Sequence, residues 1–583
     1  MIKKDIKELL YKLSPTGYIV SLDLETTGID KAKDKIIEIG AVKYDIENET
    51  KEYFSQLINP VVQISEFIED LTGISNSDVE NMPIIDEVKN EFEEFYRDYQ
   101  NNQHLIIAHN ANFDIGFLKS NGFNFKNNIF DTYDLSYTLI DKGDYNLESL
   151  ASFFNINVEN FHRAKDDSDA TLEIFFNLVN LQAGLGELNK DLYQKFSKFN
   201  IESFKNFAPF EISKHLANFE FYENKKIVKN KIDDPVISSF PKNVREFFSE
   251  KEVGKFIDSF ELRSNQLSMS EFIENNLKVK NISLIEASPG TGKTMAYLAP
   301  IALKASEEGI KAVIATNTKA LQDQIVNKDW FLINKYLSTV DKKNEIKLSI
   351  LKGRKNYICK KLVKNFIPSN FSELRVFFKI YKWSFLTIHG DISEVDLKNE
   401  FPVFLNFSAI NESCIKKCVD CYVINARNNA KNSNIILTNH SLAMTSSTTE
   451  KSILEDIDLL VIDEAHEILN VATDVFTNKN YLFDFENIFK SILKYESKIE
   501  NISLDNKKII EIYINLKNEV ENYIEELKLV NKVFNESKLN YQGILKIKID
   551  DYNQNFSRDI LFSKSNIISA LIIDFNNEID SSE

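Results

Sequence analysis

An alternating segment near the amino end constrains the fold of this chain more than any other feature. In IVSLDLETTG, apolar and polar residues alternate, with Val20, Leu22 and Leu24 on one side and Ser21, Asp23 and Glu25 on the other. A period of two is that of a β-strand, so both carboxylates share one face while the other face packs inward. Two carboxylates on a rigid strand can share or bridge hard cations. Alone, such a pattern is more often the polar outer face of an ordinary strand.

A second acidic position lies at the start of a predicted helix. The segment HLIIAHNANFDIGFL predicts a buried strand from His104 to Ala108, a loop, and a helix that opens near Phe113. Asp114 falls in the first turn of that helix. Carboxylates are common there because they interact favourably with the helix dipole, so this position alone does not indicate a site.

A third segment, FHRAKDDSDATLEIF, combines a histidine with several carboxylates. His162 precedes a predicted helix, and Asp167 lies about one turn into it. On spacing alone, Asp166 and Asp169 compete with Asp167, and a lone histidine here is more often a surface or capping residue. The packed side of the helix is formed by Leu172, Phe175 and Phe176.

Taken together, the three segments resemble the DEDDh exonucleases, the family of the proofreading subunit of bacterial replicative polymerases. The matching patterns are D-L-E-T-T-G at Asp23 to Gly28, H-N-A-x-F-D at His109 to Asp114, and H-R-A-x-D-D at His162 to Asp167. The resemblance spans residues 17–180. It implies a ribonuclease-H-like α/β fold and a site for two Mg²⁺ or Mn²⁺ ions that hydrolyses nucleic acid from the 3′ end.

The resemblance also implies a role for each residue. Asp23 would bridge the two ions, and Glu25, Asp114 and Asp167 would complete their ligand shells. Asp167 is chosen over Asp166 because the second aspartate of the family's pair is the ligand. His162 would be the general base, and the terminal nucleotide would contact Thr26, Thr27 and Phe113.

A phosphate-binding loop is predicted in the second half of the chain. NISLIEASPGTGKT predicts a buried strand, a glycine-containing loop and a helix, an arrangement whose backbone N–H groups can cradle phosphates. Lys293 would reach the β- and γ-phosphates of ATP, and Thr294 would bind its Mg²⁺. The loop consists of Ala287, Ser288, Pro289, Gly290, Thr291, Gly292, Lys293 and Thr294.

An apolar strand in LLVIDEAHEI ends in an acidic pair that suits Mg²⁺ anchoring by Asp463 and water activation by Glu464. The loop and the pair together resemble superfamily 2 DEAH-box ATPases, and more specifically DinG-type and XPD-like helicases. The segment FELRSNQ would place Arg263 and Gln266 on the adenine side. The order of the two halves matches a fused exonuclease–helicase arrangement known in Gram-positive bacteria.

All four cysteines, Cys359, Cys414, Cys418 and Cys421, lie within one stretch of the helicase-like half. Such clustering in a cytosolic chain indicates metal rather than disulfides. Four thiolates can hold a [4Fe–4S] cluster or zinc, and the helicase resemblance favours iron–sulfur. Reduced thiols without a metal are the alternative.

We therefore predict an exonuclease domain over residues 1–182, a helical connector over 183–250 and a first helicase lobe over 251–583. Within this lobe, residues 353–427 would form the cysteine-containing insertion and 468–583 a helical, arch-like region. After His466 the chain has one arginine and one glycine and no further series of strands and helices. We expect that it stops before a second lobe and binds ATP without rapid hydrolysis or unwinding.

The net charge of −18 lends nucleic-acid binding no support, but nucleases concentrate carboxylates and bind through local basic patches. No run of 18 apolar residues occurs, and we predict a cytoplasmic protein. The leading hypothesis is an exonuclease acting on single strands, with DNA preferred. The alternatives are an ATP-dependent helicase with an accessory nuclease and a module that binds single strands.

Overall fold

The computed structural model divides the chain into two compact units, Met1–Ile468 and Leu469–Glu583, and each is described by itself. The structure describes residues 4–97, 102, 104–125, 129–158, 160–199, 206–217, 240–257, 260–279, 281–340, 345–409, 418, 420–448, 454, 456–476, 489, 493 and 507–536.

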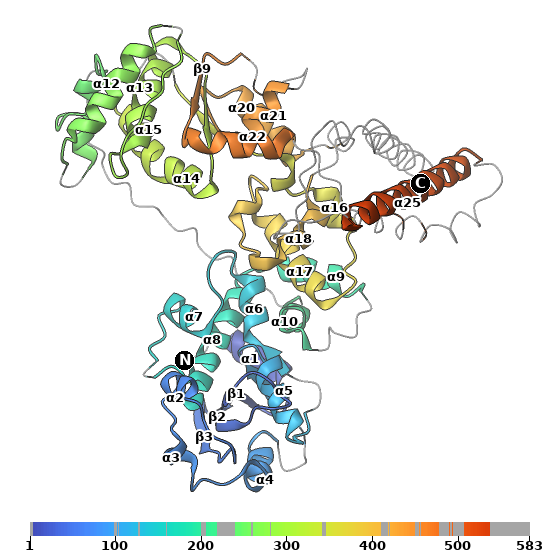
Figure 1. Cartoon of the computed structure of the whole chain (residues 1–583). Coiled ribbons are helices and arrows are strands. Elements are labelled where there is room, and N and C mark those ends of the chain that lie inside the picture. Colours follow the sequence, from blue (N-terminus) through green and yellow to red (C-terminus); the bar gives the residue numbers. More distant parts are fainter. Residues whose placement is uncertain are drawn as a thin grey trace. The chain divides into compact units, whose positions relative to one another are not determined.

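The amino-terminal domain is built on a five-stranded sheet in the order β3-β2-β1-β4-β5 (Figure 1). β1, β2 and β3 pair antiparallel, whereas β4 and β5 continue the sheet in parallel with β1. The strand predicted from the alternating segment is β1, which occupies the centre of the sheet. The strands are β1 (Tyr18–Thr26), β2 (Ile36–Asp45), β3 (Thr50–Leu57), β4 (Leu105–Ala108) and β5 (Ile129–Asp131).

Helices cover both faces of this sheet and bury most of its apolar residues in two cores. One core joins the sheet to α1, α6, α7, α8 and α10 (Ala208–Leu216), and the other joins it to α4 and α5. The long helix α8 packs directly on β1 and β2. The helices are α1 (Lys4–Leu13), α2 (Glu66–Thr72), α3 (Asn76–Val79), α4 (Ile85–Phe95), α5 (Asn112–Ser120), α6 (Thr132–Leu139), α7 (Leu147–Phe153) and α8 (Ala164–Ala183).

The described residues of the predicted connector contain the helices α9 (Leu188–Phe196), α10 (Ala208–Leu216) and α11 (Val244–Phe247). α10 packs against α1 and α9. The buried side chains of α9, with Phe196 fully enclosed, belong to the core of the later cysteine-containing segment. The connector is therefore joined to both the domain before it and the segment after it.

The helicase-like region holds a second sheet of four parallel strands in the order β7-β8-β6-β9. Its core is formed with α12, α13 and α15. The elements are α12 (Ser264–Asn276), α13 (Lys293–Glu308), β6 (Ala312–Thr316), α14 (Lys319–Gln324), α15 (Phe331–Leu337), β7 (Leu348–Ile350), α20 (Tyr422–Lys431), β8 (Ile435–Asn439), α21 (His440–Thr448) and β9 (Leu459–Ile462).

One predicted strand of this region is wrong. The residues before the phosphate-binding loop form no strand, and Ile282 and Leu284 are 97% and 91% exposed. β9 is the last strand on that side of the sheet, and in the described part of the chain nothing pairs with its outer edge. An apolar strand becomes buried only when neighbouring strands and helices cover it, so the local pattern alone did not determine its burial.

The cysteine-containing segment forms a helical body around α16 (Lys360–Asn365), α17 (Phe371–Leu386) and α18 (Phe401–Phe404). α17 also contacts α6 of the exonuclease-like domain. Arg375 of α17 donates to Asp134 over 2.7 Å, and Lys382 donates to the Leu139 carbonyl over 2.6 Å and to Asp141 over 2.8 Å. Charged contacts therefore join the two halves of the first unit.

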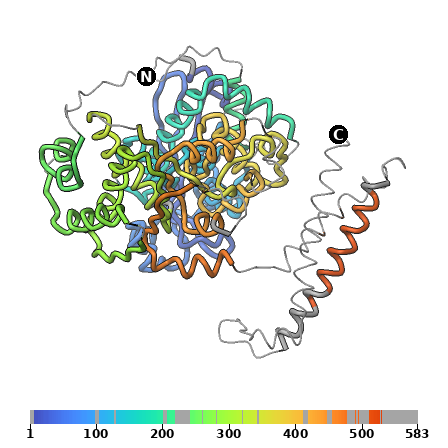
Figure 2. The backbone as a smooth tube through the Cα atoms, turned by 90° about the horizontal axis from the view of Figure 1, so that it is seen from above, coloured from blue at the N-terminus to red at the C-terminus, as the bar shows by residue number. Residues whose placement is uncertain are grey.

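The second unit contains α22 (Ile468–Phe476) from its second residue onward and the continuous helix α25 (Lys507–Glu536), seen as a tube in Figure 2. Both are amphipathic in sequence. Among the residues that the structure describes, none belongs to a helix long and apolar enough to cross a membrane.

Candidate active site and nucleotide-binding loop

β1 places the first two carboxylates of the predicted site on one face of the sheet. Along this strand Leu22 and Leu24 are almost fully buried, whereas Asp23 and Glu25 lie half-buried. The alternation seen in the sequence therefore sets the direction of the two carboxylates. Because β1 is central and paired on both sides, their positions are fixed by the sheet.

The third carboxylate, Asp114, lies in the first turn of α5 and is 2% exposed. Its Oδ1 atom accepts a hydrogen bond from the backbone N–H of Leu24 over 3.1 Å. The bonded amide belongs to the residue between Asp23 and Glu25, so Asp114 is anchored directly beside them. The predicted helix opening near Phe113 is confirmed.

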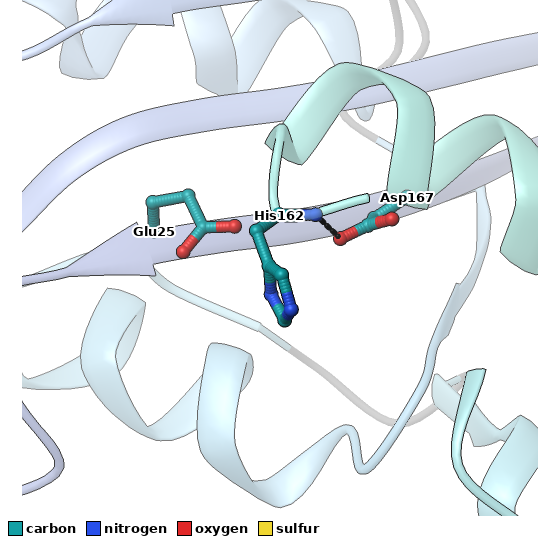
Figure 3. A group of neighbouring side chains, drawn as sticks. All are labelled: Glu25, His162 and Asp167. Atoms are coloured by element: carbon teal, nitrogen blue, oxygen red, sulfur yellow. Dashed lines mark hydrogen bonds between the residues drawn. The ribbon is translucent and has the colours of Figure 1, made fainter. Parts of the chain in front are cut away.

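The fourth carboxylate and the histidine come from the start of α8 (Figure 3). The backbone N–H of His162 donates to Oδ2 of Asp167 over 3.0 Å. Potential ligand atoms of Glu25, His162 and Asp167 lie within 4.8 Å of one another. The imidazole of His162 is exposed, and its residue adopts a left-handed φ of 63°.

The structure distinguishes the three aspartates that sequence spacing alone left as candidates for the site. Asp167 is 6% exposed and faces Glu25 and His162. Asp169 instead forms an ion pair with Lys51 over 2.6 Å on another side of the helix. Asp166 is half-buried and lies near Asn160. Only Asp167 of the three joins the group around Glu25.

One residue that positions the site was not predicted from the sequence. Glu38 of β2 is 1% exposed, and its carboxylate accepts bonds from Arg163 Nε over 3.2 Å, Arg163 Nη2 over 2.9 Å and the Ala164 N–H over 3.1 Å. Gly40 lets the strand approach, because a Cβ there would lie 2.0 Å from the Ala164 backbone. A single charged residue inside the apolar run IIEIGAV was the available signal.

Replacing Glu38 by glutamine is expected to lower the free energy of unfolding by about 1–3 kcal/mol, since hydrogen bonds to charged groups contribute about this much. The start of α8 would lose its anchor, and any activity that needs His162 and Asp167 should fall with it. Urea unfolding measures the stability change. Glu52→Gln on the exposed strand β3 is the control, and an equal loss in both variants would contradict the anchoring role.

Burial and mutual repulsion dominate the electrostatics of the four carboxylates. Burial, followed by the charges of Asp114, Asp167 and Glu25, holds the pKa of Asp23 well above its usual range. Burial and neighbouring Asp167 raise the pKa of Glu25 to about 8. Burial also raises the pKa of Asp114, and it raises that of Asp167 to about 7. The four carboxyl groups therefore hold their protons to a higher pH than usual, because ionising all of them without a cation is unfavourable.

The donor set fits hard divalent cations. Oδ1 of Asp167 is buried and has no hydrogen-bond partner, which is costly unless another group satisfies it. Carboxylate oxygens from three separate elements converge beside it, and oxygen ligands are those preferred by Mg²⁺ and Mn²⁺. Glu25, His162 and Asp167 form the one group of three or more potential ligands found in the described part of the chain.

The predicted substrate contacts lie beside the carboxylates on β1 and α5. Thr26 is buried and donates to the Gly28 carbonyl over 2.6 Å. The Thr27 hydroxyl accepts a hydrogen bond from the backbone N–H of Lys35 over 2.9 Å. Phe113 is half-buried, with its ring centroid 4.9 Å from that of Phe117. These bonds order the loop after β1 next to the acidic cluster.

The phosphate-binding loop lies immediately before α13. Gly290 and Gly292 both have left-handed φ angles, 80° and 81°, which glycine adopts without strain. The Thr291 hydroxyl donates to the Ser288 carbonyl over 2.5 Å, closing the turn. Lys293 and Thr294 are the first residues of the helix, so their N–H groups are available to an anion.

The structure brings the distant acidic pair to this loop. Lys293 Nζ lies 3.4 Å from a carboxylate oxygen of Glu464. Asp463 accepts a hydrogen bond from the Tyr297 hydroxyl of α13 over 3.0 Å. The pair follows β9, and the Asp463 N–H donates to the Ala315 carbonyl of β6 over 2.9 Å.

Arg263 and Gln266, predicted to lie on the adenine side, both contact the loop from the start of α12. Arg263 donates to the Gly290 carbonyl over 3.1 Å and Gln266 to the Gly292 carbonyl over 3.0 Å. The residues predicted for nucleotide binding thus lie close together. Ala287 and Pro289 belong to the same loop by their position in the sequence.

The cysteine cluster is described only in part. Cys359 is buried in the core around α17, and Cys421 packs partly against that core. Cys418 is half-buried, whereas Cys414 lies outside the described residues.

Two sequence models of protein families match the chain in successive regions. The model described as Exonuclease matches residues 20–175, which contain the acidic cluster. The model described as Type III restriction enzyme, res subunit, matches residues 259–504, which contain the phosphate-binding loop and the acidic pair. The chain therefore combines an exonuclease domain with a helicase-like domain.

Curated relatives align with most of the chain. The protein named 3′-5′ exonuclease DinG of Bacillus subtilis (strain 168) is 28% identical over 480 residues, covering 78% of this chain and 50% of the relative. Its namesake in Staphylococcus saprophyticus is 29% identical over 479 residues, covering 79% and 51%. The chain thus spans about half the length of these relatives.

Solved exonuclease structures are similar to a part of the chain. Exonuclease X in complex with 5′ overhanging duplex DNA covers 28% of this chain and 91% of its own, at 23% identity and a TM-score of 0.23. The nuclease domain of 3′hExo, a DEDDh family member bound to rAMP, covers 28% and 92%, at 17% identity and a TM-score of 0.25.

Proposed function

We propose that this chain is a metal-dependent 3′→5′ exonuclease that removes nucleotides from single-stranded nucleic acid, with DNA preferred. The observation that carries the proposal is the convergence of four carboxylates and one histidine from β1, α5 and α8. The polarity is carried over from relatives named 3′-5′ exonuclease. The exonuclease domain match covers all five residues.

Each residue has a role that its placement supports. Asp23, Glu25, Asp114 and Asp167 would hold Mg²⁺ or Mn²⁺, which when bound in a pair lower the pKa of a water molecule and stabilise the leaving oxygen. His162 is exposed beside Glu25 and Asp167, so its imidazole can accept the proton of the attacking water. Histidine suits this role because it titrates near neutral pH.

The substrate end would lie against the loop after β1 and the first turn of α5. The half-buried Thr27 would contact the terminal nucleotide there, and the half-buried ring of Phe113 offers a stacking surface for the terminal base. Single strands suit such a surface because their bases are free to stack.

An end-label assay tests this function. Purified protein with Mn²⁺ should release labelled mononucleotides at once from a 3′-labelled single strand. A 5′-labelled strand of the same sequence should give a ladder that shortens progressively from the other end. Addition of EDTA should stop both. Immediate release of a 5′ label, or no release at all, would refute the proposed exonuclease.

The helicase-like domain supports a second activity, the binding of ATP with Mg²⁺. The observation that favours it is the approach of Lys293 to Glu464 within 3.4 Å, with Asp463 held beside them by Tyr297. Lys293 would contact the β- and γ-phosphates, and Thr294 and Asp463 would hold Mg²⁺. Glu464 would orient a water molecule, and Arg263 and Gln266 would lie on the adenine side.

Replacing Lys293 by alanine is expected to weaken ATP binding by about tenfold or more, because a charge-assisted contact to phosphate contributes roughly 1.5–3 kcal/mol. Titration of a fluorescent ATP analogue measures the change. Lys304→Ala is the matched control, because Lys304 lies on the same helix and pairs with Glu308. Equal affinity in the Lys293 variant and the wild type would contradict the proposed loop function.

The four cysteines are proposed to hold a [4Fe–4S] cluster, with zinc as the alternative. Their clustering in sequence and the shared core of Cys359 and Cys421 support a common metal. Iron, acid-labile sulfide and zinc contents of protein purified without oxygen distinguish the two metals, and their joint absence would refute both.

A further inference from the structure

A cavity of about 590 Å³ lies between the connector and the cysteine-containing body, away from the carboxylate cluster and the phosphate-binding loop. One wall is the end of α9 with Lys195 and the residues that follow it. The other wall is the end of α16 with Lys364 and, behind it, Tyr381 of α17. Its size lies within the range of cavities that bind small organic groups.

The charge of this cavity is opposite to that of the chain. Lys195, Lys198 and Lys364 line it against one carboxylate, Asp191, in a protein of net charge −18. None of the three lysines forms an ion pair with a carboxylate in the described part of the chain. Lys195 instead donates to the carbonyls of Lys364 over 2.7 Å and Phe366 over 3.3 Å.

Holding the lysine ammonium groups of this cavity close together is unfavourable in the absence of an anion. Burial and neighbouring Lys198 lower the pKa of Lys195. A bound anion would reverse this effect, because an opposite charge nearby favours the protonated amine. Lys198 and Lys364 are exposed, so their ammonium groups can reach such an anion.

Aromatic rings accompany the lysines. Phe199 and Tyr381 both line the cavity, and the ring of the exposed Phe385 lies 5.2 Å from that of Tyr381. The ammonium group of Lys195 lies 5.3 Å above the ring of Phe199. Cations interleaved with aromatic rings are the combination that binds single strands, with phosphates on the cations and bases stacked on the rings.

We propose that this cavity is a second nucleic-acid site, which holds a single-stranded segment of the substrate by a phosphate on Lys198 and Lys364 and a base on Tyr381. The inference rests on the proposed function, because it assigns an auxiliary contact for the strand that the exonuclease domain would shorten. A free nucleotide offers the same phosphate and base, so the test distinguishes a strand from a mononucleotide.

Binding is measured with the full chain carrying Asp23→Asn, so that the strand is not degraded. The probe is a fluorescein-labelled strand of 20 thymidylates, followed by anisotropy. The pair Lys198→Glu and Lys364→Glu is expected to weaken binding by about tenfold or more and to reduce the salt slope by about 0.7, the value for one phosphate contact on a single strand. Unchanged melting curves verify folding.

The matched control is the pair Lys190→Glu and Lys361→Glu, which lies on α9 and α16, the two helices that border the cavity, but outside the cavity. This pair should bind the strand within about threefold of the parent. If both pairs of substitutions weakened strand binding equally, the effect would come from net charge alone, and the proposal would be overturned. Binding of thymidine monophosphate to the parent at least as tightly as the strand, with this binding lost in the cavity variant, would assign the cavity to free nucleotides and also overturn the proposal.

Failure here is distinguishable from failure of the proposed exonuclease. With Asp23 intact, the cavity pair should hydrolyse the p-nitrophenyl ester of thymidine monophosphate as fast as wild type, because this substrate is too short to reach the cavity. The KM of the cavity variant for the 20-nucleotide strand should rise about tenfold. If the wild type hydrolysed neither substrate, the proposed exonuclease activity would be refuted. The anisotropy measurement would still show whether the cavity binds the strand.

Discussion

Replacing Asp23 by asparagine is expected to abolish nucleotide release and, in buffer containing EDTA, to raise the melting temperature of the exonuclease domain. Asp23 lies at the centre of the acidic cluster, where burial and three neighbouring carboxylates hold its pKa well above its usual range. The amide keeps the shape of the side chain but cannot ionise, so it avoids the repulsion that an ionised Asp23 would meet in the metal-free cluster.

The two effects have different sizes. Hydrolysis should fall by about 10³-fold or more, because bound metal ions contribute several kcal/mol of transition-state stabilisation. The melting temperature should rise by about 2–4 °C, the shift that ~1 kcal/mol produces in a domain of 150–250 residues. The end-label assay and a thermal scan by circular dichroism measure them.

Asp169→Asn is the matched control, because Asp169 lies on the same helix as Asp167 but pairs with Lys51 outside the cluster. It should keep hydrolysis within about twofold of wild type and should not stabilise the fold. A variant at Asp23 that retained activity, or that melted earlier than wild type in EDTA, would contradict the proposed role of this carboxylate.

A second large effect is expected from metal and pH together. The pKa of Glu25 is raised to about 8 and that of Asp167 to about 7. A carboxyl group whose pKa is raised by folding stabilises the fold fully below its unfolded pKa, and this contribution is lost as pH rises through the folded value. In EDTA, the exonuclease domain should therefore lose stability between about pH 4 and pH 8.

Manganese should restore the lost stability. At a hundredfold excess over its Kd, a ligand that binds only the folded state adds about 2.7 kcal/mol, or roughly 5–10 °C for a domain of this size. The gain should be largest near pH 8 and small near pH 5, where protons compete for the carboxylates. Thermal scans at both pH values with and without Mn²⁺ measure it.

The Asp23→Asn variant serves as the control here as well, because it lacks the predicted bridging ligand and should respond weakly to Mn²⁺. A metal response of equal size at pH 5 and pH 8 would show that the cations bind elsewhere. So would a full response in the variant.

Much of the exonuclease site was predictable from sequence because its residues lie on regular elements. The alternation around Asp23 and Glu25 fixes their common face, and the helix start fixes Asp114. Sequence spacing alone left Asp166, Asp167 and Asp169 open. The rotation of α8 on the sheet distinguishes them, since it turns Asp169 toward Lys51 and Asp167 toward Glu25.

Other features depend on contacts between distant segments and could not be predicted. Glu38 acts through Arg163, which lies 125 positions later in the chain. The exposure of Ile282 depends on the absence of a paired strand within the described residues, not on its own apolar character. The lysine-lined cavity joins α9 to α16, and neither segment alone suggests a site.

The account depends on the carboxylates of β1, α5 and α8 sharing bound cations, and anomalous X-ray scattering from crystals soaked in Mn²⁺ tests this most directly. We predict strong manganese peaks within about 2.5 Å of the carboxylate oxygens of Asp23, Glu25, Asp114 and Asp167, and none there in the Asp23→Asn variant. An ordered cluster without manganese at saturating concentration, or equal peaks in wild type and variant, would contradict the account.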